Sequence, residues 1–88
     1  MKRIRILITG KVQGVLFRKS IHDLAKEFGI CGFVRNVKDY VEVVLEGEDS
    51  KIDKIVEFCK KGPDRAKVDK IKIFNEELKG DKEFNILR

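Results

Sequence analysis

The sequence predicts a small α+β domain whose elements follow one another as strand, helix, strand, strand, helix and strand, with one further short strand at the end. Two patterns indicate this order: apolar residues alternate with polar ones in some segments and recur every three or four positions in others. The length of 88 residues supports one hydrophobic core and leaves no room for a second. We therefore expect residues 1–88 to form a single domain.

The first strand and the first helix flank a loop that two glycines bracket. In the opening segment Ile4, Ile6 and Ile8 share one face, which is the period of a half-buried strand. Apolar residues then recur at helical spacing over Phe17–Phe28, and Gly29 stands where a helix commonly ends.

A hairpin is predicted next, with strands over residues 30–37 and 40–47 and a tight turn near Lys38 and Asp39. The second of these strands alternates between an inner and an outer face. Its inner residues are Val41, Val43 and Leu45, and its outer residues are Glu42, Val44 and Glu46.

The second helix has signals at both ends. Ser50 and Asp53 have the spacing of a capping box at its start, and Gly62-Pro63 marks its end. The apolar stripe between these signals consists of Ile52, Ile55, Val56 and Cys59.

Two more strands complete the chain. In the strand over residues 68–74, Val68 and Ile71 are an odd number of positions apart and cannot share one face of a regular strand, which predicts a bulge near Lys70. Phe84 and Ile86 suggest a short final strand. This order of elements is that of the ferredoxin-like split βαβ sandwich, an antiparallel sheet of four to five strands with two helices on one face. Because this fold carries many unrelated functions, including RNA binding, it does not indicate an activity.

Charged residues make up 40% of the chain, and the net charge is +5. So many charges favour a heat-stable protein, because ion-pair networks gain value as temperature rises; the alternative is a very soluble domain of ordinary stability. The first twenty residues contain no acid and six bases, Lys2, Arg3, Arg5, Lys11, Arg18 and Lys19. A basic end attracts anions, and phosphate compounds, nucleic acid and simple solvation all remain open.

The apolar segments predict a cytoplasmic protein, and the cysteines predict free thiols. Cys31 and Cys59 stand alone and fit neither a disulfide framework nor a metal site, so we expect reduced buried thiols, with a single bridge as the alternative. No apolar run reaches the length of a membrane span, and the alternating charged start does not fit a signal peptide.

The loop from Lys11 to Arg18 is the segment best suited to chemistry. It joins a strand to a helix N-terminus, where unpaired main-chain N–H groups bind anions, and Gly10 and Gly14 let such groups turn inward. Arg18 adds a planar fork of donors. The loop matches neither a P-loop nor a dinucleotide fingerprint, and from the residues alone a purely structural turn remains an alternative.

Two motifs in this region resemble those of a known family. The first is Gly10-x-Val12-Gln13-Gly14-Val15-x-Phe17-Arg18, and the second is Gly32-Phe33-Val34-Arg35-Asn36 followed by Asp39 and Val41-Glu42. Both closely resemble the signature of the acylphosphatase family, and the resemblance extends over nearly the whole chain. It implies the ferredoxin-like fold and hydrolysis of small acyl phosphates, without metal or cofactor.

The resemblance also implies roles for particular residues. Arg18 would bind the phosphoryl oxygens, and Asn36 would orient the attacking water. Substrate-binding main-chain groups would come from the loop residues Lys11, Val12, Gln13, Gly14, Val15, Leu16 and Phe17. Inorganic phosphate or sulfate should occupy the same site, and we expect a monomer that binds neither nucleic acid nor membranes.

The turn after Asn36 departs from the family pattern. Asp39-Tyr40 runs directly into Val41-Glu42, so a glycine is missing and the turn is one residue shorter. We expect this hairpin to close in a different way. Phe33 stands where tryptophan is common, which we interpret as a change in packing.

Other residues and functions remain open at this stage. His22 and Arg35 are interpreted as solvated surface residues, although His22 is close enough in sequence to border the site. Two alternative functions are a module that only holds carbamoyl phosphate or a similar anion, and a nucleic-acid binder, although the first strand lacks stacking aromatics. Whether the terminal carboxylate of Arg88 reaches Arg18 is also open.

Overall fold

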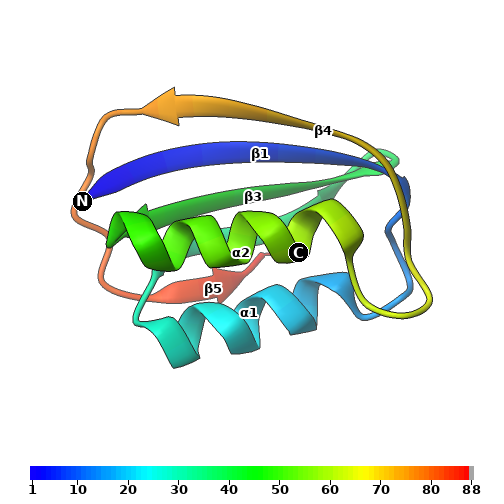
Figure 1. The fold of residues 1–88 in the computed structure, drawn as a ribbon, viewed down its shortest axis with the longest axis horizontal. Helices are drawn as coiled ribbons and strands as arrows, with labels where there is room; N and C mark the ends of the chain where they lie inside the picture. Colours follow the sequence, from blue (N-terminus) through cyan, green and yellow to red (C-terminus); the bar gives the residue numbers. More distant parts are fainter. Residues whose placement is uncertain (88) are drawn as a thin grey trace.

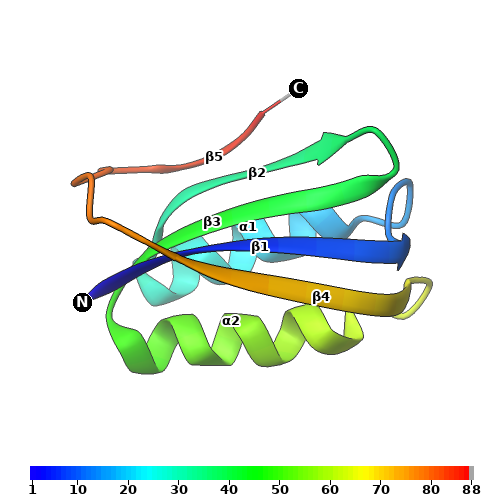
Figure 2. The same cartoon turned by 90° about the horizontal axis from the view of Figure 1, so that it is seen from above.

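Two helices cover one face of a five-stranded sheet in the computed structural model, which describes residues 1–87 (Figures 1 and 2). The predicted ferredoxin-like sandwich is confirmed, and the first helix has the predicted bounds. The elements are β1 (Lys2–Lys11), α1 (Phe17–Phe28), β2 (Cys31–Val37), β3 (Tyr40–Gly47), α2 (Asp49–Lys61), β4 (Lys67–Glu76) and β5 (Phe84–Ile86). Neither helix in residues 1–87 combines the length and apolarity needed to cross a bilayer.

The strands are arranged in the order β4-β1-β3-β2-β5. All neighbours are antiparallel except β2 and β5, which pair parallel, with Gly32 beside Phe84 and Val34 beside Ile86. The short final strand was predicted at the correct residues, but its parallel direction was not. It runs parallel because residues 77–83 cross one end of the sheet and carry the chain from one edge to the other (Figure 2).

The core lies between the sheet and the helices. Ile4, Ile6 and Ile8 are buried there, as their alternation predicted. They face the buried side chains of α1 (Phe17, Ile21 and Ala25) and of α2 (Ile52, Ile55, Val56 and Cys59). Burial of a large apolar side chain contributes about 1.5–3 kcal/mol, so this layer holds both helices on the sheet.

The predicted capping box of α2 is wrong. The helix begins at Asp49 with Glu48 as its N-cap, and no side chain caps it. Ser50 already lies in the first helical turn, where its Oγ donates to Glu48 Oε1 at 2.8 Å, and Asp53 pairs with Lys2 instead. An N-cap needs non-helical backbone angles, which Ser50 does not have in this position.

The predicted bulge in β4 is confirmed. Thr9 pairs with Lys70 whereas Gly10 pairs with Val68, which leaves Asp69 as the extra residue. Gly10 has φ 128°, and a Cβ built there would lie 2.2 Å from the carbonyl oxygen of Lys67. Only glycine therefore allows the two strands to approach where β1 ends and the Arg18 loop begins.

The outer face of β3 is also buried, contrary to the simple alternation of inner and outer residues. The side chain of Arg3 is only 3% exposed and pairs with Glu46 at 2.9 Å, Glu76 at 3.1 Å and Asp81 at 2.8 Å. Glu46 also accepts the main-chain N–H groups of Lys79 and Gly80, each at 2.8 Å. These bonds attach residues 77–83 to the sheet and cover its charged centre.

We expect Glu46→Gln to lower the melting temperature at neutral pH by on the order of 10 °C, because one charge of a buried pair is lost. Hydrogen bonds from the Lys79 amide, Arg3 and the Gly80 amide hold the pKa of Glu46 below its usual range. The stabilisation should therefore be complete above about pH 4.3 and disappear as the pH falls through the lower pKa of the folded state. Thermal unfolding from pH 7 to pH 2 measures this.

Glu57→Gln is the matched control, since it removes an exposed pair with Lys60 at 2.8 Å and should change the melting temperature little. A Glu46→Gln variant that melts with the wild type at pH 7, or stays equally destabilised at low pH, would contradict the role of this carboxylate.

Candidate active site

The segment between β1 and α1 has an unusual backbone. Gly14 has φ 71°, and Leu16, the residue directly before the helix, has φ 64° and ψ 20°. A branched residue in this left-handed region costs about 1–2 kcal/mol. Such strain is typical of functional loops, where the surrounding structure holds it in place.

This backbone leaves a run of donors unused. Among the described residues, no acceptor lies within hydrogen-bond distance of the main-chain N–H groups from Gln13 to Lys19, and the first internal bond of the helix runs from Ser20 to Leu16. No acidic residue occupies the first turn of α1. Unpaired amides and the helix dipole together give this end a positive potential.

Asn36 and Arg18 meet across one cavity at this end of the sheet. The cavity has a volume of about 280 Å³ and is lined by Val12, Gly14, Leu16, Phe17, Arg18, Lys19, Asn36 and Ile86. None of these residues is acidic. The two polar residues that the sequence assigned to chemistry, 18 positions apart, thus share one space.

Arg18 differs from the arginines of the sheet. Arg3, Arg5 and Arg35 each pair with glutamates, whereas within residues 1–87 no carboxylate lies within ion-pair distance of the Arg18 guanidinium. Arg88 lies outside the described residues, and with it the question about its carboxylate. Arg18 is thus placed to bind an anion from solution.

Asn36 lies one residue before the end of β2, on the same face as the buried Val34. Its Oδ1 is buried, and it is the only buried side-chain nitrogen or oxygen within residues 1–87 that lacks a hydrogen-bond partner. An unpaired buried acceptor costs about 1–3 kcal/mol. The carboxamide therefore has unused capacity to bind a donor such as water.

The side chain of Gln13 ties the loop to the hairpin that carries Asn36. Its Nε2 donates to the carbonyl oxygens of Lys38 and Tyr40, both at 2.9 Å. In the short turn of this hairpin Val37 pairs with Tyr40, and Lys38 adopts φ 53°. Gln13 thus connects the two segments that form the cavity, a contact that no local pattern in the sequence indicates.

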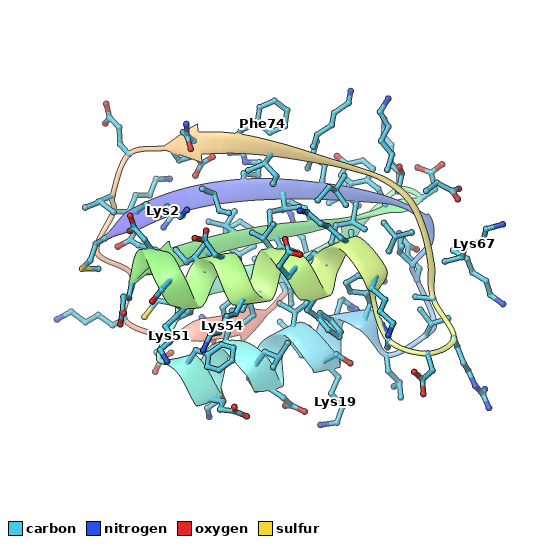
Figure 3. All side chains as sticks on the ribbon, viewed as in Figure 1. Lys2, Lys19, Lys51, Lys54, Lys67 and Phe74 are labelled. Atoms are coloured by element: carbon cyan, nitrogen blue, oxygen red, sulfur yellow. The ribbon has the colours of Figure 1, made fainter. Side chains whose placement is uncertain are left out.

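Several predicted residues lie elsewhere, and two lining residues were not predicted. Val15 is buried in the core, Lys11 lies at the exposed end of β1 opposite Lys67, and neither they nor Gln13 line the cavity. Lys19 and Ile86 do line it. Lys19 also pairs with Asp23 at 3.0 Å and extends outward from α1 (Figure 3). Ile86 reaches the cavity only because β5 pairs with β2, which the sequence does not reveal.

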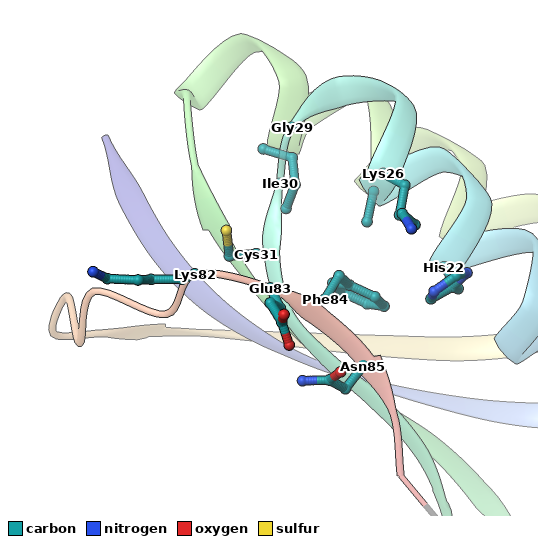
Figure 4. A pocket seen from close by; sticks show the side chains of 10 residues that line it. His22, Lys26, Gly29, Ile30, Cys31, Lys82, Glu83, Phe84 and Asn85 are labelled. Atoms are coloured by element: carbon teal, nitrogen blue, oxygen red, sulfur yellow. The ribbon is translucent and has the colours of Figure 1, made fainter.

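A larger cavity of about 470 Å³ lies at the other end of α1 (Figure 4). His22 belongs to it and not to the cavity of Arg18, and its ring is half-buried beside Phe84. Cys31 also lines it, half-buried instead of buried as expected. These residues are thus separate from the predicted site.

Neither cysteine is suited to act as a nucleophile. Both thiols are free, so the alternative of a single bridge is not realised. Burial raises the pKa of Cys59 to about 12, and burial, followed by the negative charges of Asp81, Glu46 and Glu83, raises the pKa of Cys31. Thiolates are therefore scarce at neutral pH.

The sequence profile of the acylphosphatase family matches residues 4–86, which is nearly all of the chain. The chain belongs to the acylphosphatase family. An acylphosphatase of Pyrobaculum aerophilum is 44% identical over 90 residues, covering 99% of this chain and 95% of that protein. The protein is thus an enzyme of this family, and the family resemblance predicted from its two motifs is confirmed.

Solved structures agree with the family. The crystal structure of acylphosphatase from Bacillus subtilis superposes with a TM-score of 0.95 at 32% identity and covers all of both chains. The match to full-length HypF, in its phosphate- and nucleotide-bound form, has a TM-score of 0.93 at 30% identity; it covers 99% of this chain but 12% of that one. The acylphosphatase fold thus also occurs as part of a much longer protein.

We predict that Gln13→Ala lowers kcat by about 10- to 100-fold, because a misplacement near 1 Å of a reacting group has an effect of this size. The binding of inorganic phosphate should change much less, since the loop amides remain. Steady-state kinetics with an acyl phosphate and inhibition by phosphate measure the two effects.

Thr9→Ala serves as the control, because it also removes a hydrogen bond from a side chain to a carbonyl, that of Lys70 at 3.3 Å, away from the cavity. Equal kcat values for Gln13→Ala and the wild type would show that the bond to the turn has no part in catalysis.

Proposed function

We propose that the enzyme hydrolyses the carboxyl–phosphate bond of small acyl phosphates in the cavity between Arg18 and Asn36, giving a carboxylate and inorganic phosphate. The family and the fold support acyl phosphate hydrolysis as the activity, without assigning it to particular residues. The observation that carries the assignment to this cavity is the unpaired guanidinium of Arg18 beside seven successive unpaired amides, with no acid in the lining. Such a site attracts a tetrahedral anion.

The chemistry of the substrate explains why so few groups are needed. An acyl phosphate releases a carboxylate, whose conjugate acid has a pKa of about 4. This leaving group departs without a proton, so no general acid is required. Phosphoryl transfer then depends chiefly on positioning and on stabilisation of charge on the equatorial oxygens.

Arg18 and the amides of the loop would supply the electrostatic part. The planar guanidinium can donate two hydrogen bonds to phosphoryl oxygens, and the unpaired amides of the lining residues Gly14, Leu16 and Phe17 can donate to the others. Because these donors belong to a rigid loop and a helix N-terminus, little reorganisation is needed as negative charge develops.

Asn36 would position the attacking water. A small rotation of its carboxamide would bring the unpaired Oδ1 to a water in the cavity, and the hydrogen bond would satisfy this oxygen. An asparagine is no base at neutral pH. We propose that the water's proton passes to a bound phosphoryl oxygen as the oxygen–phosphorus bond forms and the bond to the carboxylate breaks.

Substitution of the two central residues should separate their roles. Arg18→Ala should lower kcat/KM by about 1,000-fold or more and weaken inhibition by phosphate, because an arginine aimed at a transferring phosphoryl group has effects of this size. Asn36→Ala should lower kcat by about 100-fold or more and leave phosphate inhibition nearly unchanged.

Two matched changes outside the cavity are the controls. Arg65→Ala removes an exposed arginine and Asn75→Ala an exposed asparagine, and both should keep activity within about twofold. If Arg18→Ala and Asn36→Ala kept the activity of these controls, the assignment of roles would be wrong.

A binding module is the second candidate. It is favoured by the match to HypF, a much longer protein whose structure holds phosphate, and by the shortened turn after Asn36. A domain of this kind would hold an acyl phosphate or a similar anion for a partner without turnover. Phosphate binding, measured by calorimetry, together with no hydrolysis of benzoyl phosphate would favour it over the enzyme.

We predict that the wild-type activity does not depend on a metal ion. Within residues 1–87 no group of three or more histidine, cysteine or acidic side chains is placed to hold one. Incubation with a chelator should leave kcat/KM for benzoyl phosphate unchanged, and inorganic phosphate should inhibit competitively. Loss of activity with chelator and its return on addition of a divalent cation would contradict the proposed mechanism.

We further propose that the enzyme is a heat-stable monomer. The network around Arg3 is of the kind that gains value at high temperature. The sheet has two edge strands, the short β5 and the longer β4. β4 carries exposed Lys67, Lys70 and Lys72, and lysines on an edge strand oppose pairing with a second copy.

A further inference from the structure

The lining of the Arg18 cavity includes apolar side chains that phosphate binding does not use. Val12 and Phe17 are each 1% exposed and belong to the core. Leu16 is 72% exposed and Ile86 is half-buried, so these two side chains offer apolar surface to an occupant. The lining of the cavity therefore combines polar groups, on Arg18 and Asn36, with accessible apolar side chains.

Leu16 combines two unfavourable features that folding does not explain. Its backbone is in the left-handed region, with φ 64°, and its large apolar side chain faces solvent. The loop motif leaves this position open, so the phosphate cradle does not require a leucine there. An observed strained residue beside a cavity points to a function in ligand binding.

The size of the cavity fits more than a phosphoryl group. Its volume of about 280 Å³ equals roughly nine water molecules at about 30 Å³ each. In an acyl phosphate the carbonyl carbon is joined to the phosphoryl group through a single bridging oxygen. When that group lies on the amides and Arg18, the acyl part must start within the same cavity.

We infer that Leu16 and Ile86 form the subsite for the acyl group, and that the enzyme selects acyl phosphates with an apolar or aromatic acyl group over those with a compact one. This inference rests on the proposed function and extends it to a substrate class. The two side chains belong to different elements, the β1–α1 loop and β5, and lie on the lining that Arg18 and Asn36 complete. Contact with them removes apolar surface of the acyl group from water.

A neighbouring cavity of about 320 Å³ offers the competing route. Leu16 lines it together with Gly14, Val15, Ser20, Pro63, Asp64 and Arg65. Its lining contains two charged residues and no part of β5. An apolar acyl group fits the side of Ile86 better, and the contribution of Ile86 distinguishes the two routes.

The test compares kcat/KM for benzoyl phosphate and acetyl phosphate in the wild type, Leu16→Asn, Leu16→Ala and Ile86→Ala. Asparagine tolerates the left-handed conformation, so Leu16→Asn removes apolar surface without adding backbone strain. Each substrate is compared with itself across the variants, so its intrinsic reactivity cancels. Leu78→Ala, which changes a leucine that is 55% exposed in the crossover, is the matched control.

We expect all three variants to lose on the order of 5- to 10-fold in kcat/KM for benzoyl phosphate and less than about twofold for acetyl phosphate. Inhibition by inorganic phosphate should not change, and the control should match the wild type. The subsite would be overturned if the variants lost kcat/KM equally for both substrates or lost none. It would also be overturned if substitution of Leu16 had an effect and substitution of Ile86 had none. In each of these cases turnover by the wild type would still support the proposed function. If the wild type hydrolysed neither substrate, both the acyl subsite and the proposed function would be wrong.

Discussion

The arrangement of the second half of the chain depends on one buried guanidinium. Arg3 lies under the outer face of the sheet, and a charge in that position is tolerated only when its partners replace the lost hydration. Glu46 is the most buried of these partners, and it also accepts the main-chain N–H groups of Lys79 and Gly80. The same network therefore pairs the buried charges and holds the crossover in place. By doing so it delivers β5 to the edge of β2 and Ile86 to the cavity.

At the opposite end of the sheet, the proposed active site is built from two segments that contribute different groups. The loop and the N-terminus of α1 supply donors for an anion, and the end of β2 supplies the carboxamide of Asn36. The side chain of Gln13 joins these segments through two carbonyl groups of the turn. A catalytic geometry that relies on positioning requires such a link, because the turn is short, lacks glycine and holds Lys38 at a positive φ.

The charge of Arg18 in the proposed site is not used in an ion pair within the described residues. The arginines of the sheet form ion pairs with Glu42, Glu46 and Glu76. Arg18 instead lines a cavity that has no acidic residue in its lining. The loop amides are likewise unpaired, and Leu16 keeps a strained backbone. Each of these features lowers the stability of the empty protein, and together they prepare the site for a tetrahedral anion with an apolar substituent.

The sequence alone determined the features that depend on neighbouring residues. The spacing of apolar residues along a single strand or helix was enough to predict three features. These are the buried face of Ile4, Ile6 and Ile8, the bounds of α1, and the bulge next to Lys70. The residues of the loop and of the β2 end also carried the family resemblance, and with it the pairing of Arg18 with Asn36 in one site.

The tertiary structure decided the contacts between distant parts of the chain. Gln13 and Lys38 are 25 positions apart, and Arg3 and Asp81 are 78 apart. The spacing of residues within one helix or strand does not indicate such contacts. The burial of Glu46, the parallel direction of β5 and the place of Ile86 in the cavity all follow from them. α2 starts at Asp49 instead of after the apparent capping box, and Asp53 pairs with the distant Lys2. The physical reason is that burial and pairing belong to the assembled sheet, whereas propensity and pattern belong to each segment by itself.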